Sequence, residues 1–289
     1  MATVRTMKKL MLGHEIAHMI AVAGMTQAEA AVIIKTSQSR IAGLINGQGN
    51  ITVGDLERLA TRLGFTDPGH HAALEELRRN NHKRGFWTTG HNRAYAEELR
   101  LLIDIERHAD ELRTYEVEIM PGLVQCEAYV RAIHVDMPDQ DGVTLDDHVQ
   151  ARLARQDIYD KPEPPAMHFV LSESCLRRVW GDEQVMREQI DYLLALSEQP
   201  TVMVQVMPFR LPPGRRSQVG HRFTLLRVPS PGVAGPLELA YTDGHSEIRY
   251  IDNKKAIATH QNAWTRLSVA ALSFEESRAF LRQVARDFR

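Results

Sequence analysis

The chain has little of what defines several protein classes, and each shortage excludes one of them. Only two of its 289 residues are cysteine, which excludes a disulfide framework and favours free thiols in a reducing cytoplasm. No apolar run approaches the roughly 20 residues of a membrane-spanning helix, so we predict no membrane association. The apolar segment after Lys8 and Lys9 is interrupted by histidine and glutamate, so we predict no signal peptide.

Sequence motifs of common enzyme chemistry are also missing. Residues 93–289 contain no phosphate-binding P-loop, no G-x-G-x-x-G, no nucleophile elbow and no clustered metal ligands. We therefore predict that the protein is not an enzyme and has no catalytic residues, no metal site and no cofactor.

What the chain does contain is the composition of a soluble globular protein, with 43% hydrophobic and 25% charged residues. Its length suits two domains. The net charge of -2 is unevenly spread, because residues 1–84 hold 11 Lys/Arg against 7 Asp/Glu. A basic N-terminal part followed by an acidic remainder suits a nucleic-acid reader joined to a domain that does not touch nucleic acid, although surface charge sampled at random can also differ this much.

Two short helices with a tight turn between them are predicted from Thr26 to Gly47. Thr26 and Ser37 are good N-cap residues, and each precedes a run of apolar residues at helical spacing. In the second helix Ile41, Leu44 and Ile45 share one face, which we expect to be buried.

The opposite face of that second helix is polar, and we predict that it contacts DNA. Gln38 and Ser39 are expected to read base edges, while Arg40 is expected to reach a base or a phosphate. Gln27 and Asn46 are expected to set the register on phosphates. The complete predicted DNA-binding set is Thr26, Gln27, Ser37, Gln38, Ser39, Arg40, Gly43 and Asn46.

Residues 10–64 resemble the DNA-binding domain of the Cro and phage-repressor family, also called the Xre family. The resemblance rests on T-Q-A-E-A-A from Thr26 and T-S-Q-S-R-I-A-G-L-I-N-G from Thr36. It implies a helix-turn-helix fold and a double-stranded DNA operator, bound by a homodimer. Lys35 stands where the family has a glycine, so either the lysine takes a positive φ or the turn closes in another way.

A string of a different kind, H-E-x-x-H, lies in the first predicted helix. His14 and His18 are four residues apart and could hold zinc, with Glu15 as general base, which is the pattern of a zinc metallopeptidase. No convincing third ligand follows, so we prefer the alternative that these side chains form a solvated face of the helical domain. A third hypothesis is an interaction module without DNA binding. Three departures from the family's pattern make it conceivable: Lys35 in the turn, Gly43 in the middle of the second helix, and Ile45 where the family has a glutamate.

We predict three parts: a helix-turn-helix domain at 1–66, a linker at 67–92, and an α/β regulatory and dimerisation domain at 93–289. The fold class is therefore multidomain, an all-α helix-turn-helix bundle followed by a mixed α/β domain with a small sheet. Residues 93–113 have the apolar spacing of one long helix. Five later segments are predicted as strands, at 168–171, 201–208, 222–228, 237–241 and 247–251.

The second domain resembles the C-terminal domain of actinomycete antitoxin-like transcription regulators, which include WhiJ-type developmental regulators. The matching strings are M-P-G-L-V-Q at 120–125, A-R-L-A-R-Q at 151–156, L-S-E-S-C-L-R-R at 171–178, V-M-R-E-Q-I at 185–190 and V-Q-V-M-P-F at 204–209. This resemblance implies a cytoplasmic regulator whose second domain binds a small, toxin-like partner protein, or else a small-molecule effector. The arginines of the second and third strings either clamp an anionic ligand or form ion pairs; we favour ion pairs.

Overall fold

The computed structural model describes residues 5–79, 94–136, 142–217, 220–244 and 248–288. The chain divides into two compact units. The first consists of residues 1–88, 101–108 and 228–237, and the second of residues 89–100, 109–227 and 238–289. The segment that joins two strands of the second unit's sheet, 228–237, therefore belongs to the first unit.

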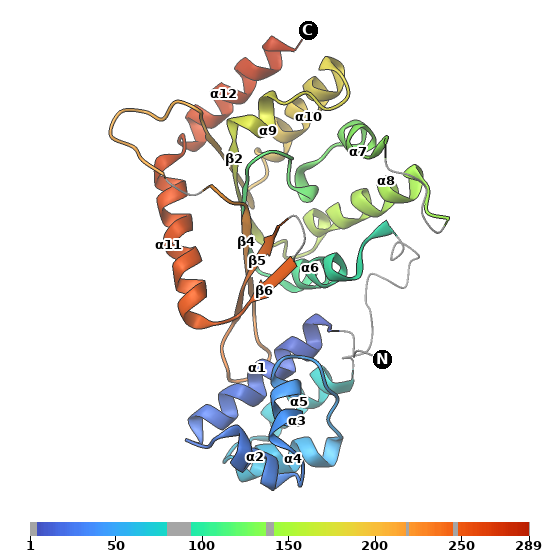
Figure 1. Ribbon diagram of the computed structural model, residues 1–289, viewed down its shortest axis with the longest axis vertical. Coiled ribbons are helices and arrows are strands. Elements are labelled where there is room, and N and C mark those ends of the chain that lie inside the picture. The colour runs from blue at the N-terminus through green and yellow to red at the C-terminus, as the bar shows by residue number, and fades with distance from the viewer. Residues whose placement is uncertain (1–4, 80–93, 137–141, 218–219, 245–247, 289) are drawn as a thin grey trace. The chain divides into compact units, whose positions relative to one another are not determined.

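The first unit is a bundle of short helices (Figure 1). Its helices are α1 (Met7–Val22), α2 (Gln27–Ile33), α3 (Gln38–Ile45), α4 (Val53–Arg62), α5 (Pro68–Arg79) and most of α6 (Glu97–His108). Helix α5 forms the first part of the segment that we predicted as a linker, and residues 80–92 of that segment lie outside the described residues. Each of its helices buries one apolar face, since the buried side chains recur at helical spacing.

Helices α1 to α4 end in the same way, with one residue in the left-handed conformation. At three of these ends the residue is glycine: Gly24, Gly47 and Gly64. After α2 it is Lys35, with φ at +52°. The Lys35 N–H donates to the carbonyl of Val32 (3.1 Å) and the Thr36 N–H donates to the carbonyl of Ala31 (2.9 Å), which is the Schellman pattern. The turn of the helix-turn-helix is thus closed by a lysine at positive φ, one of the two possibilities that the sequence left open.

Replacing Lys35 by glycine should stabilise the first unit. A residue with a Cβ atom costs about 1 kcal/mol or more in the left-handed region, and glycine removes that cost. We expect the melting temperature of this unit to rise by roughly 4 °C or more. Lys35→Ala is the matched control: it removes the charge and keeps the Cβ atom, so it should give no comparable gain. Equal gains from both variants would show that charge, and not backbone conformation, matters at this position.

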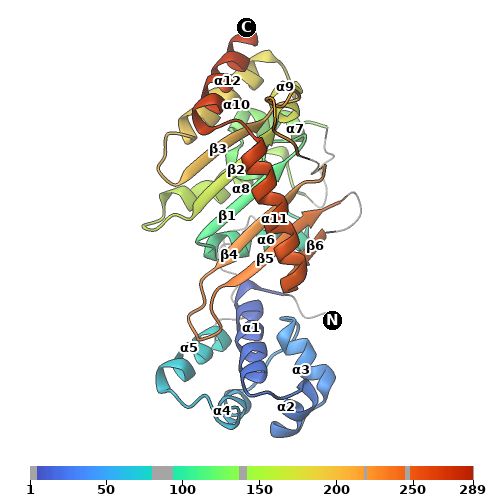
Figure 2. The ribbon, with the colours of Figure 1, turned by 90° about the vertical axis from the view of Figure 1, so that its left-hand side faces the viewer.

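The second unit is built on a six-stranded mixed sheet in the order β3-β2-β1-β4-β5-β6 (Figure 2). Strands β1, β2 and β3 are parallel, whereas β4 runs antiparallel to β1 and β6 antiparallel to β5. The strands are β1 (Glu111–Glu116), β2 (Ala166–Ser172), β3 (Val202–Met207), β4 (Phe223–Val228), β5 (Leu237–Asp243) and β6 (Ile248–Ile251).

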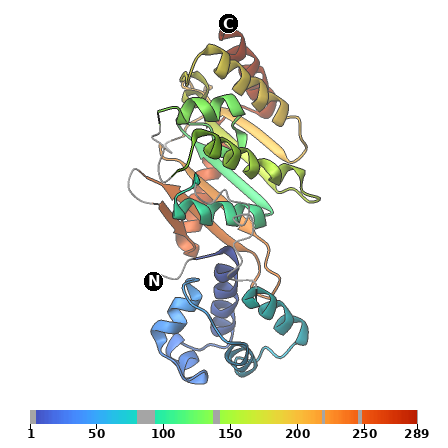
Figure 3. The same ribbon diagram turned by 90° about the vertical axis from the view of Figure 1, so that its right-hand side faces the viewer.

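Helices cover both faces of this sheet. The helices of the second unit are α7 (Glu127–His134), α8 (Leu145–Ala154), α9 (Glu173–Arg177), α10 (Glu183–Leu196), α11 (Lys254–Ala270) and α12 (Phe274–Asp287), with 3₁₀ turns at Gly122–Val124 and Arg155–Asp160. Helix α11 crosses one face, where Trp264 and Leu267 pack on Val170 and Phe223 (Figure 2). Helices α7 and α8 lie over the other face (Figure 3). The run Phe169–Leu171 is buried on both faces, which explains why it is continuously apolar.

The structure confirms the predicted fold class and corrects one element. The helix predicted over 93–113 ends at His108, and residues 111–116 form β1, a central strand. Leu112 continues the apolar spacing of the helix, yet it is a buried strand residue. A short break at Ala109 and Asp110 separates the two elements.

Candidate nucleic-acid interface

The two helices of the helix-turn-helix each begin at a side-chain cap. Thr26 caps α2: its hydroxyl accepts from the Glu29 N–H (3.2 Å), while the Glu29 carboxylate accepts from the Thr26 N–H (2.7 Å). Ser37 caps α3 by accepting from the Arg40 N–H (3.2 Å). Each cap satisfies a backbone donor that the helix itself leaves free, and together the caps fix where α2 and α3 start.

Helix α3 has one buried face and one exposed polar face. Ile41 and Leu44 are buried in the first unit, whereas Ile45, which we also expected to be buried, is half-buried. Four of the predicted DNA-binding residues on α3 or at its end are exposed: Gln38, Ser39, Arg40 and Asn46. The sequence periodicity therefore predicted correctly which side of this helix faces away from the core.

The remaining predicted site residues lie around this face. Ser37 is exposed, and its hydroxyl lies 2.9 Å from that of Ser39. Thr26 is exposed at the start of α2, and Gln27 beside it is half-buried. Gly43 is half-buried, with open space where a Cβ atom would stand. Six of the eight predicted residues are thus exposed and two are half-buried; contact of these residues with DNA stays a prediction.

Arg40 has a partner that the sequence did not indicate. Its guanidinium donates to the backbone carbonyl of Asn50 (3.2 Å), in the loop after α3. An exposed hydrogen bond of this kind is worth little in water and can be exchanged for a phosphate oxygen. The bond holds the guanidinium on the exposed face of α3.

A glycine on α1 sets how closely α3 approaches that helix. A Cβ atom on Gly13 would lie 2.3 Å from the Ile45 carbonyl oxygen and 2.6 Å from that of Leu44. Only glycine permits this contact between α1 and the C-terminal end of α3. The only sign of this contact in the sequence is the presence of a glycine inside a helical pattern. Such a glycine costs about 1 kcal/mol relative to alanine unless a contact requires it.

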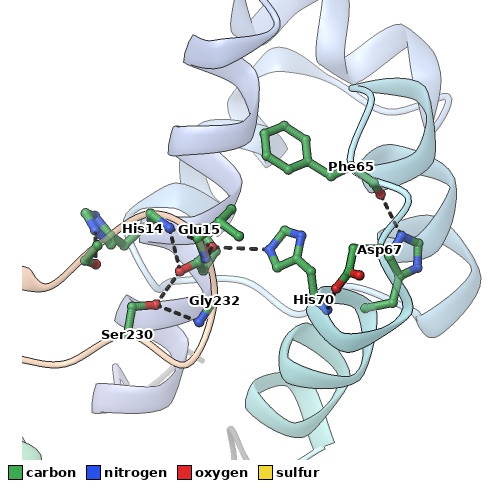
Figure 4. Close-up of polar contacts among 11 residues, drawn as sticks. His14, Glu15, Phe65, Asp67, His70, Ser230 and Gly232 are labelled. Carbon is green, nitrogen blue, oxygen red and sulfur yellow. Dashed lines mark hydrogen bonds and ion pairs between the residues drawn. The ribbon is translucent and has the colours of Figure 1, made fainter.

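The H-E-x-x-H string does not form the solvated face that we predicted, because Glu15 is fully buried. Its carboxylate sits in the segment Ser230–Ala234, which joins β4 to β5 and belongs to the same unit (Figure 4). The Ser230 hydroxyl, the Val233 N–H (3.1 Å) and the Ala234 N–H (3.1 and 3.3 Å) all donate to it. A Cβ atom on Gly232 would lie 2.4 Å from the carboxylate carbon. We call this arrangement the Glu15 socket.

The Glu15 socket holds an ionised carboxylate. Burial raises the pKa of Glu15, but the hydrogen bonds from Ser230, Ala234, Val233 and His70 outweigh it, and the pKa is lowered. His70 on α5 places Nε2 3.3 Å from the carboxylate, and its Nδ1 has no partner among the described residues. Because the carboxylate can only accept, Nε2 is the ring nitrogen that donates to it.

The two histidines of the string also have structural roles. The His14 Nε2 lies 3.2 Å from the carbonyl of Gly235, and the His18 ring packs edge-on against Phe65. Within the described residues no group of three His, Cys, Asp or Glu side chains could hold a metal ion. Glu15 is saturated with donors and closed off from water, so it cannot serve as the general base of a zinc peptidase.

In the second unit, three glutamines fix the backbone of residues 120–126. Gln125 donates to the Met120 carbonyl (2.7 Å), and Gln156 donates to the Gln125 carbonyl (2.6 Å). Gln189, fully buried, donates to the Val124 carbonyl (2.7 Å) and accepts from the Cys126 N–H (2.9 Å). These glutamines come from three of the five strings behind the second resemblance. In this structure they satisfy the backbone polar groups of a buried loop.

Three arginines of the second and third strings contact other side chains of the second unit. Arg177 pairs with Glu173 (2.5 Å) and Asp287 (3.3 Å), and Arg178 pairs with Glu118. The guanidinium of Arg152 lies over the Tyr95 ring, 5.6 Å from its centroid, in the manner of a cation–π contact. The ion pairs of Arg177 and Arg178 confirm the interpretation that we preferred for them.

Two family models match the chain. Residues 23–69 match a family described as Helix-turn-helix, a likeness that fits α2 and α3 and indicates a DNA-binding regulator. Residues 99–283 match a family described as a domain of unknown function, DUF5753. Comparison with curated proteins and with solved structures gave no match.

Among the described residues no single helix is long and apolar enough to span a membrane; α1 and α2 reach that length and apolarity only as a pair, which is bent by 102°. Since the second family model covers more than half of the chain, the protein belongs to the family defined by this domain of unknown function, DUF5753.

Proposed function

We propose that this protein is a sequence-specific, DNA-binding transcription regulator that inserts α3 into the major groove. The observation that carries the proposal is the exposure of Gln38, Ser39 and Arg40 at the start of α3, while Ile41 and Leu44 hold the helix in the core. Glutamine pairs bidentately with adenine, and arginine with guanine or a phosphate. A capped helix at the end of a tight turn is how helix-turn-helix proteins present such side chains.

The proposed operator has two-fold symmetry. A single helix-turn-helix domain buries little surface on DNA, so useful affinity calls for a homodimer on two half-sites, about 34 Å or a multiple of it apart. In this proposal the second domain supplies the dimer contact and, as the antitoxin-like resemblance suggests, binds a small partner protein in the cytoplasm. A small-molecule effector is the alternative within the same class.

The Gln38→Ala variant tests the proposal. The specific duplex is the DNA upstream of the protein's own gene. Loss of one bidentate base contact costs about 1–3 kcal/mol, so we expect roughly ten- to hundredfold weaker binding to the specific duplex. Binding to random duplex, which rests on phosphates, should change little. The measurement is a fluorescence-anisotropy titration of both duplexes over a salt series.

Gln283→Ala, an exposed glutamine on α12, is the matched control and should leave both affinities unchanged. If Gln38→Ala binds the specific duplex as tightly as the wild type does, α3 is not the reading helix. If the wild type itself does not distinguish the specific duplex from random DNA, the interaction module without DNA binding becomes the better description.

A further inference from the structure

Helix α1 lies outside both matched families, yet it contacts segments of each. It ends at Val22, just before the helix-turn-helix match at 23–69 and well before the DUF5753 match at 99–283. Beyond its apolar face, α1 also buries Gly13 and Glu15. Two residues two positions apart lie on opposite sides of a helix, so Gly13 and Glu15 contact different neighbours.

One side of α1 holds the end of α3. The contact of Gly13 with the Ile45 carbonyl leaves no room for even a methyl group. One turn earlier, Leu10 lies against Gly47, the left-handed residue that follows α3. A Cβ atom on Gly47 would stand 3.1 Å from the Leu10 Cδ2 and 3.2 Å from its backbone nitrogen. Contacts as close as these do not survive a displacement, so the end of α3 cannot keep its place if α1 moves.

The other side of α1 is held by the DUF5753 match. Two segments of that match, 101–108 and 228–237, belong to the first unit. In the first of them the Asp104 carboxylate accepts from the Met7 N–H (2.8 Å), in the first turn of α1. The second forms the Glu15 socket (Figure 4). Buried carboxylates thus hold α1 at its start and in its middle.

Both of these segments continue directly into the sheet of the second unit. Segment 228–237 joins β4 to β5, and α6 is followed by β1. A displacement of these strands therefore reaches α1 through the covalent chain. The Glu15 socket is the contact that can open, because its donors to the carboxylate lie on a loop, and loops open locally more readily than packed helices do.

We infer that α1 couples the Glu15 socket to α3, so that the DUF5753 domain controls DNA reading by opening or closing the socket. With the socket closed, α1 holds the end of α3 in place. With the socket open, α1 is released and the end of α3 moves with it. Glu15 is then a positioning residue, which acts on DNA only through α1 and α3. The inference rests on the proposed function in taking α3 as the reading helix, and it adds how that helix is regulated.

Hydrogen exchange of the full-length protein without DNA, followed amide by amide by NMR, tests the coupling. Ser230→Ala removes one donor to the Glu15 carboxylate. A hydrogen bond to a charged group is worth roughly tenfold in an equilibrium constant, so the Ala234 N–H should exchange about ten times faster. If the socket and α3 open together, the Gln48 N–H, which closes the end of α3, should speed up by the same factor.

Two controls separate this coupling from a general loss of stability. In Ser230→Ala the Leu63 N–H at the end of α4 should exchange at the wild-type rate, because α4 stays folded when the socket opens. Ser174→Ala removes another bond from a hydroxyl to a carboxylate, this one in the second unit, and should leave the Gln48 N–H unchanged. The inference is overturned if Ser230→Ala speeds up the Ala234 N–H alone, or if it speeds up Leu63 as much as Gln48.

DNA must act back on the socket as strongly as the socket acts on α3. If only the closed form reads DNA, a specific duplex at 100 times its Kd should slow the Ala234 exchange by up to about 100-fold. Shielding by the duplex itself would not explain this, because segment 228–237 contains no lysine or arginine to bind phosphates. A duplex that binds specifically and leaves the Ala234 exchange unchanged overturns the control of DNA reading. If no duplex binds specifically, the proposed function fails, whereas Gln48 exchange in Ser230→Ala still decides whether the socket and α3 are coupled.

Discussion

Replacing Glu15 by glutamine should destabilise the first unit more than any exposed substitution in it. The carboxylate accepts from Ser230, Val233, Ala234 and His70, all in positions that fit oxygen atoms. A glutamine amide turns an N–H₂ group toward one set of these donors and removes the charge that strengthens the rest. Breaking a buried, charged hydrogen-bond cluster costs about 3–5 kcal/mol, so we expect the melting temperature of this unit to fall by roughly 10 °C or more.

The effect of Glu15→Gln should depend on pH in a direction that the lowered pKa determines. Glu15 has a lower pKa when folded than the ordinary value of 4.5, so its stabilising contribution is fully present above about pH 4.5. The contribution is lost as the pH falls through the folded pKa. The difference in unfolding free energy between wild type and variant should therefore be constant from about pH 6 to 8 and shrink below about pH 4.5.

Glu57→Gln, on the exposed face of α4, is the control and should leave the melting temperature almost unchanged. Gly232→Ala is a second test of the Glu15 socket, because the new methyl group would overlap the carboxylate. It should lower the melting temperature as well. If Glu15→Gln has the same melting temperature as the wild type at neutral pH, the segment Ser230–Ala234 does not hold the carboxylate in solution.

Gly13→Ala is the second substitution from which we expect a large effect. Glycine to alanine inside a helix normally stabilises by about 1 kcal/mol. Here the new methyl group would lie 2.3 Å from a backbone oxygen of α3, and backbone cannot rotate out of the way. Overpacking of this kind costs about 1–3 kcal/mol, so the sign of the substitution is reversed. Since α3 must shift, affinity for the specific duplex should fall together with the melting temperature.

Gly54→Ala is the matched control, because Gly54 is also a helical glycine and has open space where its Cβ atom would stand. It should raise the melting temperature and keep DNA affinity. Thermal melts and the same anisotropy titration are needed for all three proteins. A stabilised Gly13→Ala protein would show that α1 and α3 lie further apart than the structure has them.

The helix-turn-helix was predictable because its determinants are local. Thr26 and Ser37 cap helices through residues three positions away, and Ile41 and Leu44 repeat at helical spacing. Such patterns are read from a few neighbouring residues. The positive φ of Lys35 was only one of two possibilities that the sequence left open, because a lysine does not by itself require the left-handed conformation that it takes here.

The role of Glu15 could not be predicted, because its partners are far away in the sequence. Ser230 is 215 residues from Glu15, and His70 is 55 residues from it. A charged residue at helical spacing normally faces solvent, and nothing near Glu15 indicates a buried acceptor site. Gly13 presents the same problem, since its packing partner is the backbone of another helix.

Strand β1 was missed for a different reason. Leu112 falls where a helix continued from residue 97 would place an apolar residue, so the helical pattern extends into the strand. What makes residues 111–116 a strand is pairing with β2 and β4, both distant in sequence. Sheet pairing overrides a local helical pattern when both faces of the strand become buried.

The most direct test of whether α3 reads bases is a selection of bound sequences from a random duplex pool. It is carried out in parallel with the wild-type and Gln38→Ala proteins. The wild type should enrich two symmetry-related half-sites with centres about 34 Å or a multiple apart. Gln38→Ala should lose the preference at one base pair in each half-site and keep the others. Identical preferences for the two proteins, or no enrichment by the wild type, would contradict the assignment of α3 as the helix that reads DNA.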